Sequence, residues 1–102
     1  MVIKIGSKRF EVIFQKQACK DHGTESSGRM SDWHQRIWID TDQRSFNSIE
    51  SDLWHETIEA IDKVFDLRLS HQTITTLGSG IHQAAQQKTF WKEFYEKYSD
   101  NR

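Results

Sequence analysis

The sequence predicts an α+β fold in which a small antiparallel sheet of about three strands is packed by two or three helices. Three observations lead to this prediction. Apolar residues alternate with period two over residues 2–14, and from residue 49 onward they recur every three or four residues. The length of 102 residues suits a single domain, 1–102, and is too short for two that fold independently.

The N-terminal part is predicted to hold the strands. Residues 2–14 have the pattern of a β-hairpin with a turn at Gly6-Ser7-Lys8, in which Ile13 is the one apolar residue out of phase. Residues 15–35 are polar and contain few large apolar side chains, so we expect a long loop there. Residues 36–40 then have the composition of a short third strand.

Three helices are predicted in the remainder. The first spans residues 48–65, where Ser48, with Ser51 and Asp52, supplies capping groups. A short extended return at 66–69 leads to Ser70, which occupies the N-cap position of a second helix over 70–87. Glycines at 78 and 80 weaken this helix by about 1 kcal/mol each relative to alanine and allow a neighbour to approach closely. Aromatic residues mark a third helix over 89–98.

Charge and composition exclude several classes of function. Fourteen basic and fifteen acidic residues give a net charge of −1, which provides no general positive field for a phosphate backbone, so no nucleic-acid partner is expected. The single cysteine, Cys19, cannot form an internal disulfide. No apolar run approaches the roughly 18 residues of a membrane span, and the N-terminus lacks a signal-peptide pattern. We therefore expect a cytoplasmic protein with no membrane partner.

The segment Leu-Trp-His-Glu-Thr-Ile-Glu-Ala-Ile-Asp, residues 53–62, is the most informative part of the chain. On a helix, His55 and Glu59 are about 40° apart in azimuth and about 6 Å apart along the axis, so both side chains can bind one ion. Asp62 lies on the same face. Glu56 follows the histidine at the edge of this face, where its carboxylate can act on a metal-bound water. The pattern predicts a zinc (Zn2+) site, although a helix face with these residues is also typical of a solvated surface.

A third protein ligand is needed, and His71 is the best candidate. Five extended residues after Phe65 retrace about 16 Å, which is comparable to the roughly 15 Å of helix between His55 and Phe65. If the two helices are instead joined by a tight turn, His71 stays near the far end of the first helix. His82 lies about 16 Å further along the second helix, so the two histidines cannot bind the same ion. His22 and His34 fall in predicted loops, and His34 is a minor alternative ligand.

Glu59 stands where the His-Glu-x-x-His helix of zinc metallopeptidases has its second histidine. The run from Ile-Trp-Ile-Asp (37–40) through a polar loop to His-Glu-x-x-Glu-Ala-Ile-Asp, and on to Leu-x-Leu-Ser-His (67–71) and a further helix, resembles small phage and prophage proteins of the minimal zincin, metallopeptidase-like type. The resemblance covers residues 36–87. It implies zinc held by His55, Glu59 and His71, with Glu56 as the general base in hydrolysis of a protein or peptide substrate. The exchange at position 59 leaves both an active hydrolase and a structural or degenerate metal site open.

A different class of function is also compatible with the sequence. The aromatic residues of the C-terminal helix form a stripe that either completes the core or docks on another subunit. Together with the polar segment 15–35, this stripe suggests a catalytically inert interaction module, such as a phage accessory or inhibitor protein that binds a host protein.

Overall fold

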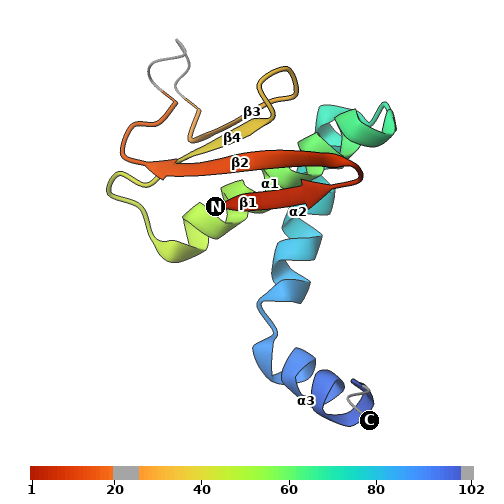
Figure 1. The fold of residues 1–102 in the computed structure, drawn as a ribbon. Coiled ribbons are helices and arrows are strands. Elements are labelled where there is room, and N and C mark those ends of the chain that lie inside the picture. The colour runs from red at the N-terminus through yellow and green to blue at the C-terminus, as the bar shows by residue number, and fades with distance from the viewer. Residues whose placement is uncertain (20–25, 100–102) are drawn as a thin grey trace.

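Among the residues that the computed structural model describes, 1–19 and 26–99, four strands precede three helices (Figure 1). The strands are β1 (Val2–Ile5), β2 (Lys8–Gln15), β3 (Gly28–Ser31) and β4 (Arg36–Asp40). The helices are α1 (Phe46–Phe65), α2 (His71–Ala85) and α3 (Lys88–Tyr98). The predicted α+β class is confirmed.

The sheet differs from the prediction in strand number and in direction. Its order is β1-β2-β4-β3, so it has four strands where we expected about three. The β1–β2 and β3–β4 pairs are antiparallel, whereas β2 and β4 run parallel, with Glu11 opposite Arg36. The sheet is therefore mixed, because β3 and β4 form a hairpin that returns the chain alongside β2 in the same direction.

Strand β3 lies inside the segment 15–35 that we expected to be a loop. Its sequence, Gly-Arg-Met-Ser, has only one apolar side chain and so carries no period-two signal. An edge strand obtains its order from hydrogen bonds to one neighbour, here β4, and not from its own hydrophobic pattern. The prediction of an uninterrupted loop was wrong for this reason. Residues 20–25, with His22, lie outside the described part.

The predicted β-hairpin is present, with a turn shorter than expected. Lys8 already pairs with Ile5, so only Gly6 and Ser7 connect the strands. Gly6 has φ +60°, a left-handed conformation that glycine adopts without strain. A Cβ atom at Gly6 would also lie 3.1 Å from Val64 Cγ1. The turn therefore requires glycine both for its backbone and for the close approach of α1.

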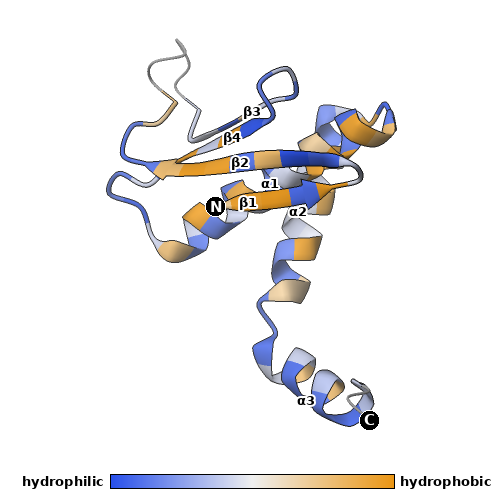
Figure 2. Ribbon diagram, viewed as in Figure 1, coloured by the Kyte–Doolittle hydropathy of each residue, from blue (hydrophilic) through white to orange (hydrophobic). Residues whose placement is uncertain are grey.

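Helix α1 covers one face of the sheet, and the main core lies between them. This core contains Phe10 and Val12 of β2, Ile37 and Ile39 of β4, and Ala60 of α1. Figure 2 shows hydrophobic colour on most of β1 and on the C-terminal half of β2, whereas the N-terminal half of β2 is hydrophilic. Ile13, which is out of phase in the sequence, packs on the opposite face of the sheet in a second cluster with Ala18, Cys19 and Trp38.

The boundaries of α1 and α2 follow their capping residues. Helix α1 starts two residues earlier than predicted because Ser45 is the N-cap, and its side chain accepts the Ser48 N–H at 3.1 Å. The predicted caps at residues 48, 51 and 52 are thus inside the helix. Ser70 caps α2 as predicted, accepting the Thr73 N–H at 3.1 Å. No helix in the described ranges is both long enough and apolar enough to cross a bilayer.

Helix α3 extends away from the rest of the molecule (Figure 1). The radius of gyration is 15.0 Å, compared with the roughly 13 Å of a compact chain of this length. None of its residues is buried. Its orientation relative to α2 is held by the Trp91 indole, which donates a hydrogen bond to the Ala84 carbonyl at 2.7 Å.

Candidate metal centre

The three predicted metal ligands converge. His55 and Glu59 project from successive turns of α1, and His71 is the first residue of α2. One possible ligand atom from each residue lies within 4.8 Å of those of the other two. The rings of His55 and His71 meet edge to face, with centroids 5.4 Å apart. His55 and Glu59 are half-buried and His71 is exposed, so the group opens to solvent.

The segment between the helices brings His71 back toward His55. The end of α1 has the hydrogen bonds of a Schellman motif, with the Leu67 N–H donated to the Asp62 carbonyl at 3.1 Å and Asp66 left-handed at φ 51°. Arg68 is also left-handed, at φ 59°, so the return is kinked and not uniformly extended as predicted. The return segment nevertheless brings His71 close to His55, as predicted.

Asp62 has a different role from the one that its helical phase suggested. Its buried carboxylate accepts the Leu69 N–H at 2.9 Å, and it is not part of the cluster of ligand atoms. Two residues after Leu69, the chain enters α2 at His71. Asp62 therefore holds the return segment in place and so helps to position His71.

Helix α2 packs closely on α1 at Gly78. A Cβ atom at this position would lie 3.5 Å from His55 Cα and 3.6 Å from His55 N, in ordinary van der Waals contact. A larger side chain would push the helices apart at the ligand residue itself. Gly80 has nothing within 4 Å of a Cβ position, so the predicted close approach applies to Gly78 alone.

Glu56 lies beside the ligands and is almost completely buried, at 6 % exposure. It reaches toward β3, where a Cβ atom on Gly28 would be 3.0 Å from both its Cγ and its Oε2. Its Oε1 is buried without a hydrogen-bond partner in the described structure. The pKa of Glu56 is raised to about 9, chiefly by burial, with further contributions from the adjacent Glu59 carboxyl, through hydrogen bonding and like charge, and from Asp52.

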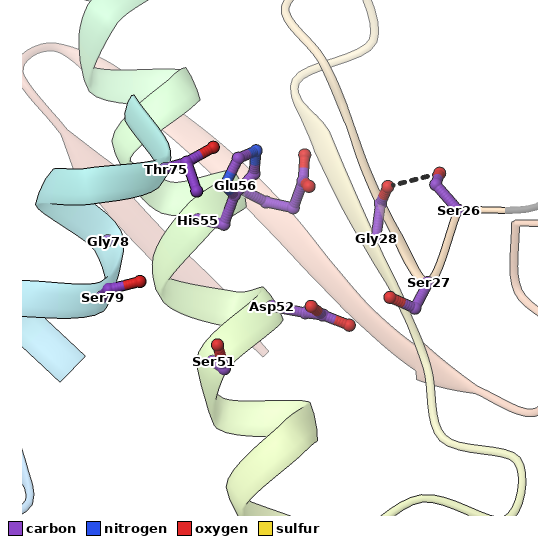
Figure 3. Close-up of a pocket in the computed structure, with 10 residues that line it drawn as sticks. All are labelled: Ser26, Ser27, Gly28, Ser51, Asp52, His55, Glu56, Thr75, Gly78 and Ser79. Carbon is purple, nitrogen blue, oxygen red and sulfur yellow. Dashed lines mark hydrogen bonds between the residues drawn. The ribbon is translucent and has the colours of Figure 1, made fainter. Parts of the chain in front are cut away.

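Glu56 and His55 line a cleft of about 310 Å³ between α1, α2 and the start of β3. Figure 3 shows Asp52 and Glu56 directed from α1 toward Ser27 and Gly28, while α2 forms the opposite wall. Hydroxyl groups dominate the remaining lining, which comprises Ser26, Ser27, Ser51, Thr75 and Ser79. The sequence gives no indication of these residues, because they come from three separate segments and share no spacing pattern.

The ligand set fits zinc in chemistry and nearly in geometry. Two histidines and a glutamate are a known set for catalytic zinc, in which three protein ligands leave the fourth position open. Tetrahedral zinc places its ligands about 3.4 Å apart, so a pair of ligand atoms at the 4.8 Å limit must approach by about 1.4 Å. Exposed His71 can supply this movement by side-chain rotation. The Oε1 of Glu56, which has no hydrogen-bond partner in the described structure, adds a buried polar atom beside these residues.

The other candidate ligands have separate partners. His82 is buried against Glu50, with Nε2 and Oε1 3.0 Å apart. His34 Nδ1 lies 2.9 Å from Ser31 Oγ, at the turn between β3 and β4. Cys19 is buried, and its pKa is raised chiefly by that burial. Among the described residues, only His55, Glu59 and His71 form a group that can hold an ion.

Comparison of the chain with protein-family models, with curated proteins and with solved structures finds no match. The resemblance to minimal zincins therefore stays a prediction. The case for a function rests on the geometry of the ligand cluster and of Glu56.

Proposed function

We propose that the chain is a zincin-like, zinc-binding protein that hydrolyses an amide bond in a protein or peptide. The convergence of His55, Glu59 and His71 from two helices is the observation that supports this proposal. Three ligands of this type, one of them exposed, are characteristic of catalytic and not of closed structural zinc sites. A phage or prophage origin follows from the sequence resemblance alone and remains part of the proposal.

The residues of the chain have distinct roles in this reaction. A zinc ion bound there supplies a Lewis acid and a water that is acidic near neutral pH. His55 and His71 would each bind the ion through an uncharged ring nitrogen, and the Glu59 carboxylate would cancel one of the two positive charges of zinc. Glu56 lies next to the ligands and lines the cleft, but its pKa of about 9 keeps it protonated near neutral pH in the metal-free chain. A zinc ion beside it would lower this pKa and favour the carboxylate. In that form Glu56 would accept a proton from the attacking water and return it to the leaving amine.

The position of β3 suggests how a substrate is held. β3 is an edge strand, and Gly28 at its start lies against Glu56. An extended peptide can form backbone hydrogen bonds with an unpaired strand edge, which places its amide groups along the cleft. The hydroxyl groups of the cleft then favour small polar side chains over large apolar ones.

Elemental analysis of purified protein tests the metal site. We expect about one equivalent of zinc per chain, and loss of zinc in His55→Ala, Glu59→Ala and His71→Ala. The matched control is His34→Ala, which removes a histidine outside the cluster and should keep the metal. Zinc should also raise the melting temperature, because only the folded chain assembles the site. Metal-free protein from a zinc-replete preparation would refute the proposal.

Glu56→Gln separates catalysis from metal binding. This variant should retain zinc and lose peptide hydrolysis by at least about 100-fold, the usual contribution of a general base.

The competing proposal is a catalytically inert module that binds a host protein through the exposed aromatic face of α3. In that case Glu56→Gln has no effect, and truncation after Gln87 abolishes capture of the partner.

A further inference from the structure

We propose that two copies of this chain associate as a symmetric dimer through the aromatic face of α3. This face, here called the α3 stripe, consists of Phe90, Trp91, Phe94, Tyr95 and Tyr98. At 100° per residue these five positions lie within about 140° of the helix circumference. They therefore form one continuous surface and not a set of scattered aromatic residues.

The α3 stripe is largely uncovered. Phe90 is 56 % exposed, Phe94 43 %, Tyr95 59 % and Tyr98 62 %. The rings contact one another along the helix: Phe94 packs against Trp91, Tyr95 and Tyr98, with centroids 5.4 to 6.2 Å apart. Side chains ordered in this way present a preformed apolar surface, and so lose little conformational entropy on binding.

Within the described residues, α3 is joined to α2 by the hydrogen bond from Trp91 to Ala84, but no side chain of α3 is buried against the rest of the chain. It has 11 residues and buries none of them. Isolated helices shorter than about 12–15 residues are only marginally stable in water, and packing of an apolar face supplies most helix stability in proteins. A second copy of the stripe provides such a face without requiring any other molecule.

The stripe continues into an apolar groove at the junction of the helices. Trp91 and Tyr95 of α3 line this groove of about 520 Å³ together with Trp54 of α1 and Ile81 and Ala85 of α2. Ile81 is 40 % exposed, and Leu77, one turn earlier on α2, is 42 % exposed. The dimer surface thus includes the outer flank of α2 beside the stripe.

The exposed area is sufficient for a specific interface. At about 150–250 Å² for each aromatic ring, the stripe, Leu77 and Ile81 together leave roughly 550 Å² of apolar surface uncovered in one copy. Two copies then bury about 1,100 Å², which exceeds the approximately 1,000 Å² that a specific interface requires. This area is at the upper end of the roughly 300–600 Å² covered by the largest apolar patch of a typical monomer, and such patches often mark interaction surfaces.

Charges beside the stripe favour antiparallel pairing with a second copy. Glu93 and Lys97 border it on one side, next to Phe90, Phe94 and Tyr98. When two α3 helices run antiparallel around a twofold axis near Tyr95, Glu93 of one copy faces Lys97 of the other. The symmetry repeats this ion pair, so both pairs are attractive.

Sedimentation equilibrium of the full chain over a range of micromolar concentrations tests the dimer. We expect wild-type protein to sediment as a dimer, and Phe94→Glu to weaken association by at least about 100-fold, since it places two carboxylates in the apolar interface. Trp33→Glu is the matched control: Trp33 is 90 % exposed in the β3–β4 turn, far from α3. It should leave the dimer intact. Wild-type protein that remains monomeric throughout overturns the proposal.

Charge reversal identifies the second copy as the partner. Glu93→Lys and Lys97→Glu each place like charges opposite one another, so each variant alone should dimerise roughly tenfold more weakly than wild type. An equimolar mixture of the two variants restores complementary charges between copies and should recover the dimer. A mixture that associates no better than the separate variants overturns antiparallel pairing. Zinc content should be unchanged in every variant, so this test is independent of the metal site.

Discussion

Replacing Gly28 with alanine tests the packing of β3 on the candidate site. The added Cβ atom would lie 3.0 Å from Glu56 Cγ and from Glu56 Oε2. The backbone of Gly28 is not left-handed, so alanine introduces no backbone strain there. Any loss of stability therefore reports on the contact with Glu56.

Two opposing effects determine the expected magnitude. Alanine restricts the unfolded chain more than glycine, which stabilises the fold by about 0.4–1 kcal/mol where the native backbone accommodates it. Overpacking a filled site costs about 1–3 kcal/mol. Glu56 is 6 % exposed and its Cγ is held close to α1, so it cannot move aside freely. We expect overpacking to dominate, with a net loss of about 1 kcal/mol.

The assay is urea denaturation of chelator-treated protein in a double-mutant cycle. In a Glu56→Ala background the obstructing atoms are gone, so Gly28→Ala should change sign and stabilise the fold by about 0.4–1 kcal/mol. Gly80→Ala is the control: no atom lies within 4 Å of the new Cβ, and it should stabilise α2 by about 0.5–1 kcal/mol in either background. Equal effects of Gly28→Ala in the two backgrounds would refute the placement of β3 against Glu56.

Three further predictions concern the groups around the site. Asp62→Ala removes the acceptor of the Leu69 N–H and should lower zinc affinity about tenfold in a chelator competition assay, whereas Asp62→Asn, which keeps an acceptor oxygen, should retain most of it. Burial raises the pKa of Glu56 from 4.5 to about 9, so between these values the unfolded state of metal-free protein binds fewer protons than the folded state. Wild type should therefore lose stability relative to Glu56→Gln as pH rises through this window, measured by urea denaturation, and a constant difference would contradict the burial of a neutral carboxyl. His82→Ala leaves half-buried Glu50 without its partner and should cost about 1–3 kcal/mol by thermal denaturation, while unchanged stability would show that the pair is not formed.

The parts of the fold that the sequence predicted are those with a local signal. The β1–β2 hairpin and helices α1 and α2 have hydrophobic periods that their own residues specify, and Ser70 marks the start of α2. Strand β3 and the parallel β2–β4 pair lack such a signal. The β2–β4 pair joins segments 25 residues apart, such as Glu11 and Arg36, which no short window of the sequence detects. Strand β3 is ordered by its pairing with β4 and not by a hydrophobic pattern of its own.

In the candidate site, too, only the features with a local sequence signal were predicted. The ligands on α1 follow from helical spacing, and His71 follows from the length of the returning segment. The burial of Glu56 could not be predicted in this way. Glu56 packs against Gly28, which lies on β3, and the sequence did not predict that strand. Asp62 was assigned to the ligand face by phase alone, although the backbone of the return already occupies its carboxylate.

The two halves of the metal site differ in how firmly the fold holds them. His55 and Glu59 share one long helix that packs on the sheet, so their separation is fixed whenever α1 is formed. His71 is exposed, and its position depends on two left-handed residues and on the hydrogen bond from Leu69 to Asp62. A metal ion that joins the halves would therefore order mainly the return segment and the first turn of α2. Binding energy used in this way reduces affinity, so a less stable return segment should weaken zinc binding at the proposed site.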